Sequence, residues 1–298
     1  MRRYDLEEQM TYSLESGLSL KTKGNVESEL LLATKWMSEA LSIDYRNTRL
    51  GQYLRYLEGK EKLDSLADLQ KYSLIARELE DLLRVFQAFI NDEQPTLKSK
   101  IQTVISGQMF RYDAAREEND ASRDYLHELA VAARFKNSGL VVDISGECDV
   151  VVRYRGKEIF IECKRIKSAK QLVKRFKKAE KQLVSRLGIS KRNKIGFIAL
   201  DVTDLIDCQD EPAVFTNVES LNNYLYVRLS EFVSKNKDIM RQYVGRETKS
   251  VLFFANGFGV VLDNAQSRVI NTTVIHALGC ESSPKDEKIN EKILRHML

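Results

Sequence analysis

The sequence predicts an α/β protein in which an all-helical N-terminal region precedes a core of alternating helices and strands. In residues 1–115, apolar residues recur every three or four positions, which is typical of amphipathic helices. From residue 119 the pattern changes to the order helix, strand, strand, strand, helix, strand. With 298 residues the chain has room for two domains. We therefore predict a helical region over 1–115 and an α/β domain over 116–298.

Two segments define the expected N-terminal helices. Residues 25–41 begin with an Asn and continue with apolar residues at helical spacing, and residues 65–90 repeat this pattern for about seven turns. Pro95 marks a break after them. We expect this region to serve partner binding, homodimer formation or substrate gating.

The α/β part carries recognisable start and stop signals. Asn119 or Asp120 is a favourable N-cap for a helix that ends at Gly139. Arg155-Gly156 is a suitable tight turn between two strands. The expected elements are helix 119–139, strands 140–145, 148–155 and 157–164, helix 168–187, strand 194–202, helix 220–236, strands 250–264 and 268–278, and helix 285–298.

The hairpin around Arg155-Gly156 brings two carboxylates together. A two- or four-residue loop centred there pairs Val150 with Ile161 and places Asp149 opposite Glu162, whereas a three-residue loop does not. Directly opposed residues have Cβ atoms about 4.5–5.5 Å apart, and like charges so placed destabilise a sheet. The alternative is that both acids are solvated at strand ends.

A divalent cation is the simplest compensation for this repulsion. Mg²⁺ prefers oxygen ligands and commonly uses one or two carboxylates. Strand periodicity places Lys164 on the same side as Glu162. Cys163 points to the opposite side, into the core, while its backbone carbonyl remains a candidate metal ligand. Asp149, Glu162 and Lys164 are therefore the candidate catalytic residues, and the lysine can orient water or neutralise charge on a phosphate.

At this point "CDVVVRYRGKEIFIECKR", with its flanking helices, resembles the PD-(D/E)xK nuclease superfamily. The resemblance covers about residues 119–202 and implies a restriction-endonuclease-like α-β-β-β-α-β core with a mixed sheet. It assigns Asp149 and Glu162 to the two acids of the motif and Lys164 to its lysine, while Cys148 replaces the Pro. It implies a Mg²⁺-dependent nuclease, with Mn²⁺ as a substitute metal, and favours a DNA endonuclease.

The resemblance also implies two supporting residues. Many members carry a Glu on the first core helix, which points to Glu128 as a catalytic residue and a further candidate metal ligand. Some carry a Gln on the second core helix, which points to Gln182. The alternatives are a Glu on the solvated edge of an amphipathic helix and an ordinary surface Gln.

The excess positive charge of the chain is concentrated directly after the motif. Residues 164–194 hold 13 Lys and Arg but one acid, Glu180, out of 47 bases and 43 acids in the whole chain. Such a block points to a polyanion such as the phosphate backbone. A solvated face is the alternative; membrane binding is disfavoured because the apolar stripe of the helix is needed against the sheet. The expected nucleic-acid contacts are Arg165, Lys167, Lys170, Lys174, Lys178, Lys181 and Gln182.

Several function classes are excluded or disfavoured. The N-terminus lacks the apolar segment of a signal peptide, and no apolar run is long enough to span a membrane. The four cysteines form no CxxC pair, which disfavours a zinc site or disulfide framework and favours a cytoplasmic protein. Two alternatives to a nuclease stay open: a non-cleaving nucleic-acid-binding module on a nuclease-like fold, and a mainly helical interaction protein. DNA versus RNA and endo versus exo cleavage are also open.

Overall fold

The structure, a computed structural model, describes most of the chain. The ranges it describes are residues 11–15, 23–58, 65–92, 95–110, 120–146, 148–188, 193–206, 213–263, 266–280, 291–293 and 295. The expected helix 285–298 falls mostly outside them.

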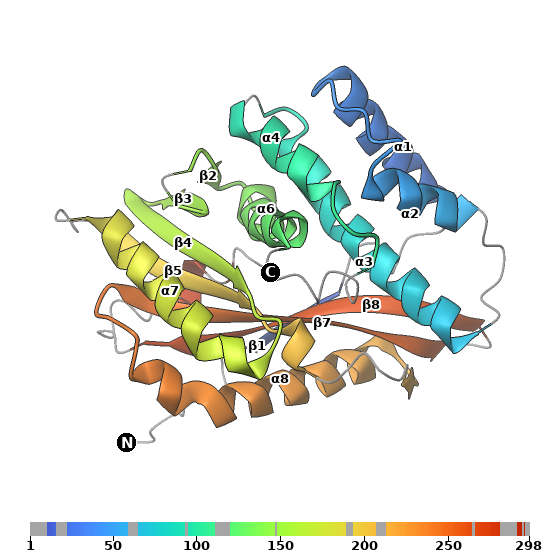
Figure 1. The fold of residues 1–298 in the computed structure, drawn as a ribbon. Coiled ribbons are helices and arrows are strands. Elements are labelled where there is room, and N and C mark those ends of the chain that lie inside the picture. Colours follow the sequence, from blue (N-terminus) through green and yellow to red (C-terminus); the bar gives the residue numbers. More distant parts are fainter. Residues whose placement is uncertain are drawn as a thin grey trace.

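A mixed β-sheet forms the centre of the molecule (Figure 1). Its strand order is β1-β8-β7-β5-β4-β3-β2, and β6 pairs with β7. The β4–β5, β5–β7 and β6–β7 pairs are parallel, while the others are antiparallel. The strands are β1 (Thr11–Glu15), β2 (Val141–Asp143), β3 (Val150–Tyr154), β4 (Lys157–Arg165), β5 (Lys194–Asp201), β6 (Val214–Phe215), β7 (Thr248–Asp263) and β8 (Gln266–Gly279). The α/β class and the mixed sheet are therefore confirmed.

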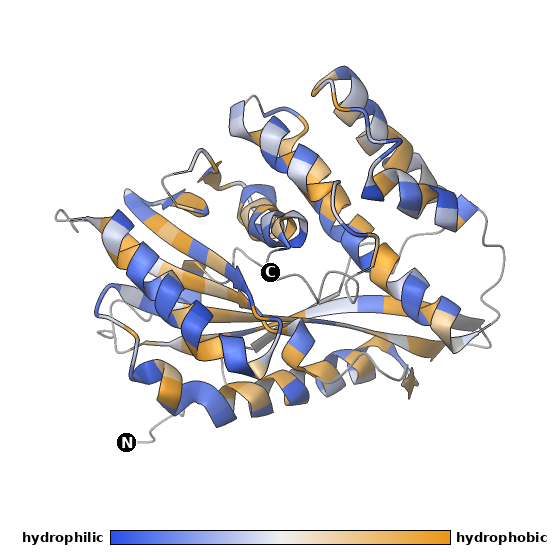
Figure 2. Ribbon diagram, viewed as in Figure 1, coloured by the Kyte–Doolittle hydropathy of each residue, from blue (hydrophilic) through white to orange (hydrophobic). Residues whose placement is uncertain are grey.

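Helices cover both faces of this sheet. The described helices are α1 (Lys23–Glu39), α2 (Arg49–Glu58), α3 (Leu66–Phe89), α4 (Pro95–Val104), α6 (Ala121–Asn137), α7 (Ala169–Leu187), α8 (Val218–Arg241) and the short η1 (Thr203–Leu205). Helix α6 packs on one face together with the N-terminal helices, while α7 and α8 cover the other (Figure 1). Figure 2 shows hydrophobic residues concentrated on the central strands and hydrophilic residues along α7.

The order α6-β2-β3-β4-α7-β5 agrees with the predicted order of the core elements. Asp120 caps α6, because its side chain accepts a hydrogen bond from the Arg123 amide. Arg155 and Gly156 both have positive φ, 48° and 74°, as a two-residue type I′ turn requires. The β3–β4 register pairs Val150 with Ile161, so the predicted hairpin register is confirmed.

The N-terminal region differs from the prediction in two ways. It contains a strand, β1, which pairs antiparallel with β8, so the expectation of an all-helical region is wrong at residues 11–15. This strand is stabilised by a partner about 260 residues away, which no local pattern reveals. Trp36, Phe89 and Leu97 also share one hydrophobic core with Phe135 and Ile161. The expected boundary near residue 115 lies in 111–119, outside the described residues.

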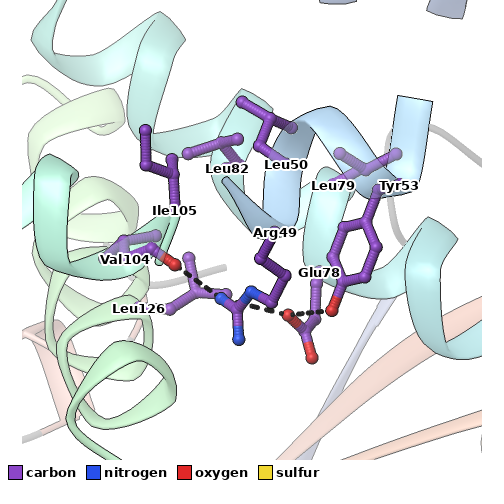
Figure 3. Close-up of a pocket in the computed structure, with 9 residues that line it drawn as sticks. All are labelled: Arg49, Leu50, Tyr53, Glu78, Leu79, Leu82, Val104, Ile105 and Leu126. Carbon is purple, nitrogen blue, oxygen red and sulfur yellow. Dashed lines mark hydrogen bonds and ion pairs between the residues drawn. The ribbon is translucent and has the colours of Figure 1, made fainter. Parts of the chain in front are cut away.

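A buried ion cluster ties the N-terminal helices to α6, and Figure 3 shows its members Arg49, Tyr53 and Glu78. Glu78 of α3 lies 3.3 Å from Arg49 and 2.7 Å from Arg123, and it accepts a hydrogen bond from the Tyr53 hydroxyl. The cavity beside them measures about 10 Å³, room for no more than one water molecule. This cavity is therefore part of the packing between the helices and not a ligand site.

Replacing Glu78 by Gln should destabilise the protein by about 3 kcal/mol at pH 7. Burial raises the pKa of Glu78, but Arg49, Arg123 and Arg77 outweigh it and hold the pKa at about 2. Because the folded-state pKa is depressed, the stabilisation is complete above the ordinary value of 4.5 and is lost as the pH falls towards 2. Urea unfolding of both proteins should show the difference shrinking from pH 7 to pH 3. A difference that does not change with pH would contradict this account.

Candidate active site

Three oxygen atoms converge on the Lys164 ammonium at the open end of the β3–β4 hairpin. The Lys164 Nζ lies 3.2 Å from Asp149 Oδ2, 3.3 Å from Glu162 Oε2 and 2.8 Å from the Cys163 carbonyl oxygen. Asp149 directly precedes β3, and its Oδ2 also accepts a 2.8 Å hydrogen bond from the Cys163 amide. The structure thus brings together the three residues of the predicted motif.

The side chain of Glu162 is fully buried, and each of its two carboxylate oxygens has a partner. Its Oε1 accepts a hydrogen bond from the Cys148 thiol at 3.2 Å and pairs with Arg186 Nε at 3.1 Å. Its Oε2 faces Lys164. Cys163, one residue later, is buried in the core with Ile161, as strand alternation predicts. The strand therefore presents Glu162 and Lys164 to the site and anchors itself through its other side.

The protonation of these groups follows from their burial and mutual charges. Burial and the Asp149 charge raise the pKa of Glu162, and Lys164 and Arg186 oppose this. Burial lowers the pKa of Lys164, but Asp149 and Glu162 outweigh it, so the net shift is upward. Burial and the Glu162 charge raise the pKa of the Cys148 thiol. Lys164 is therefore charged at neutral pH, and Cys148 stays protonated as a hydrogen-bond donor.

Glu128 of α6 lies close enough to Asp149 and Lys164 for their charges to act on it. Burial, followed by the Asp149 charge, raises the pKa of Glu128 to about 7. Its Oε2 lies 3.0 Å from the Nζ of Lys100, a residue of α4. Both side chains are only 13% exposed. The alternative of a Glu on a solvated helix edge does not agree with this burial.

The outer face of α7 carries a stripe of exposed lysines, and the one acid of the helix, Glu180, lies on its buried face. Leu172, Phe176 and Leu183 are buried against the sheet. Glu180 is also buried, and accepts hydrogen bonds from the Gly245 amide and the Thr248 hydroxyl. The exposed lysines of the helix are Lys170, Lys174, Lys177, Lys178 and Lys181. Glu180, the one acid of the basic block, therefore holds α7 against the start of β7, and the lysines face solvent.

The expectation that Arg165 contacts phosphate is contradicted. Arg165 is 5% exposed, and its guanidinium forms ion pairs with four acids: Asp120, Asp124, Asp201 and Asp204. The reason is strand alternation, since Arg165 lies on the side of Cys163 rather than that of Lys164. This side is covered by the N-terminal end of α6.

Two other predicted contacts are less exposed than the lysine stripe. Lys167 is half-buried, and burial lowers its pKa. Gln182 is also half-buried, one helical turn before Arg186, and its Oε1 has no hydrogen-bond partner in the described part of the chain. Because residues four apart share a helix face, Gln182 lies on the same face of α7 as Arg186, which pairs with Glu162.

Three contacts of the site are absent from the sequence prediction. Arg186 lies within the basic block, and its four-residue spacing from Gln182 was the available signal. Cys148 occupies the Pro position of the motif, but its hydrogen bond to Glu162 has no sequence signature. Lys100 is separated from Glu128 by 28 residues, and only the packing of α4 on α6 brings them together.

The donor set fits a hard divalent cation. Asp149 Oδ2, Glu162 Oε2 and the Cys163 carbonyl oxygen surround one cationic nitrogen, and these are the oxygen ligands that Mg²⁺ and Mn²⁺ accept. Among the described residues, no group of three or more His, Cys, Asp or Glu side chains is arranged to hold a metal ion. A cation here would therefore rest on two carboxylates and a backbone carbonyl.

Within the described ranges, no helix is both long and apolar enough to cross a bilayer. Comparisons of the chain with protein-family models, with curated proteins and with solved structures each gave no match.

Proposed function

We propose that the protein is a metal-dependent nuclease that hydrolyses phosphodiester bonds, with DNA as substrate and internal cleavage as its mode. The observation that carries this proposal is the convergence of Asp149, Glu162 and the Cys163 carbonyl on a single cationic atom. Opposed buried carboxylates destabilise a sheet unless a cation compensates them. A bound catalytic cation would compensate the repulsion between the two carboxylates.

The element order supports a restriction-endonuclease-like core. Segment α6-β2-β3-β4-α7-β5 has the order of the PD-(D/E)xK superfamily, and its hairpin presents the acids and the lysine in the positions of that motif. A shared architecture does not by itself establish an activity, so the proposal rests on the site and uses the fold as support.

Each side chain of the site then has a defined role. Asp149, Glu162 and the Cys163 carbonyl would hold Mg²⁺, and Glu128 of α6 would support them. Bound Mg²⁺ supplies charge for the phosphate oxygens and lowers the pKa of water. Lys164 shifts from the carboxylates to orient the attacking water or to neutralise charge on the phosphate. Arg186 and Cys148 fix Glu162 so that one of its oxygens faces the site.

The lysine stripe of α7 supports a polyanionic substrate. Lys170, Lys174, Lys178 and Lys181 follow one another at spacings of three and four residues, so they form one face. Their mutual repulsion is relieved when phosphate groups replace the counterions around them. These contacts position the nucleic acid without reading its sequence.

Incubation of supercoiled plasmid with the protein tests the proposal. We expect nicked and linear products with Mg²⁺ or Mn²⁺ and intact plasmid when EDTA is added. A matched single-stranded RNA and a linear duplex with blocked ends test the substrate and the mode of cleavage. Cleavage that persists in EDTA, or no cleavage of any of these substrates with either metal, would contradict the proposal.

A nucleic-acid-binding module that does not cleave is the second candidate. One observation favours it: the Lys164 ammonium lies within ion-pair distance of both carboxylates, so their charges are compensated without a metal. The same plasmid experiment separates the two. Retarded but intact DNA with Mg²⁺, Mn²⁺ and Co²⁺ would favour the module.

A further inference from the structure

We propose that Lys100, which the N-terminal helix α4 contributes, is a positioning residue that directs Glu128 into the active site. This inference rests on the proposed function, since it assigns Glu128 a part in that site. It gives the N-terminal helices a direct part in the site, whereas the nuclease-like motif lies wholly between residues 119 and 202.

Helix α4 is fixed against the core of the protein. Its residues Leu97 and Ile101 are fully buried in the same hydrophobic cluster as Leu129 and Phe135 of α6. Lys100 therefore extends from a helix whose position is fixed by its packing in the hydrophobic core.

The same helix contacts two of the three segments that supply acids to the site. At its first turn, the Thr96 hydroxyl donates a hydrogen bond to the Ile144 carbonyl, 3.2 Å away. Ile144 is buried and stands five residues before Asp149. One turn further on, Lys100 pairs with Glu128. Helix α4 thus bridges the chain before Asp149 and the helix that bears Glu128.

The Lys100–Glu128 ion pair is short and mostly shielded from solvent. Its N–O distance is 3.0 Å, and each side chain is 13% exposed, so the pair is shielded from solvent. The ammonium also lies 5.4 Å from the ring centroid of Tyr125, three residues before Glu128 on α6. Lys100 contacts the Oε2 atom of Glu128, and the charge of Asp149 acts on the same carboxyl group.

A matched pair of lysine variants tests this inference. Lys98 is exposed on the same helix two residues away and serves as the control. We expect Lys100→Met to weaken Mn²⁺ binding to the protein alone, followed by electron paramagnetic resonance, by about 10–100-fold, the range known for residues that orient metal ligands. The kcat for plasmid cleavage should fall by a similar factor. Lys98→Met should leave both unchanged, and Lys100→Arg should retain most of the Mn²⁺ affinity.

A Glu128→Gln background separates positioning from folding. If Lys100 acts through Glu128, the double variant E128Q/K100M should bind Mn²⁺ as E128Q does, because the residue that Lys100 positions is already neutral. The double variant leaves no unpaired charge of this pair, so the comparison stands even if K100M alone does not fold. Equal Mn²⁺ affinity in K100M and the wild type, or a further loss in the double variant, would overturn the inference. Absence of Mn²⁺ binding in the wild type would instead overturn the proposed function, and the role of Lys100 with it.

Discussion

Replacing Asp149 by Asn should reduce Mg²⁺-dependent cleavage by at least about 10³-fold, or about 4 kcal/mol in the activation free energy. The Asn side chain has nearly the same shape, and its oxygen can still accept the hydrogen bond of the Cys163 amide. What it lacks is the negative charge that faces Lys164 and Glu162. Initial rates of plasmid nicking over a range of Mg²⁺ concentrations measure the effect.

Asp143→Asn is a matched control for this variant. Asp143 belongs to the neighbouring strand β2 and accepts a hydrogen bond from the Ser145 amide. This variant should cut plasmid at the wild-type rate. The melting temperature of Asp149→Asn shows whether it has folded. A folded Asp149→Asn protein that nicks plasmid as fast as the wild type would show that the metal site is wrongly assigned.

Replacing Lys174, Lys178 and Lys181 together by Gln should weaken DNA binding by about 500-fold at 0.1 M salt. Each phosphate contact contributes about −0.9 to the slope of log affinity against log salt, so three lost contacts make the slope about 2.7 shallower. The three side chains are exposed and lie on one face of α7, so their loss leaves the buried face of the helix intact. Fluorescence anisotropy with a labelled duplex, at several salt concentrations in EDTA, measures both quantities.

The control for the lysine stripe changes the same amount of charge elsewhere. Lys35, Arg55 and Lys98 are exposed bases of α1, α2 and α4. Their joint replacement by Gln should change the affinity and the salt slope far less than the α7 variant does. Equal losses from the two triple variants would show that binding follows net charge alone and that α7 is not the nucleic-acid surface.

Local signals in the sequence were sufficient for the core elements and for the motif. Arg155-Gly156 determines the turn, the turn determines the β3–β4 register, and the register brings Asp149 beside Glu162. Each step depends on residues close together in the chain. The lysine stripe of α7 was predictable for the same reason, because helical spacing separates it from the buried residues.

Contacts between distant segments were not predictable in this way. Strand alternation alone placed Arg165 away from Lys164, but only the fold shows that α6 covers that side with acids. Lys100 reaches Glu128 because α4 packs on α6, and β1 exists because β8 lies beside it. These contacts depend on tertiary packing, which the periodicity of a single segment does not encode.

A crystal structure of the protein soaked in Mn²⁺ tests the central claim most directly, because the anomalous signal of manganese locates the ion. We predict one anomalous peak within coordination distance of Asp149 Oδ2, Glu162 Oε2 and the Cys163 carbonyl oxygen, with the Lys164 ammonium moved away from the two carboxylates. Manganese bound elsewhere, or no peak while Lys164 stays between Asp149 and Glu162, would contradict the assignment of this site as a catalytic metal centre.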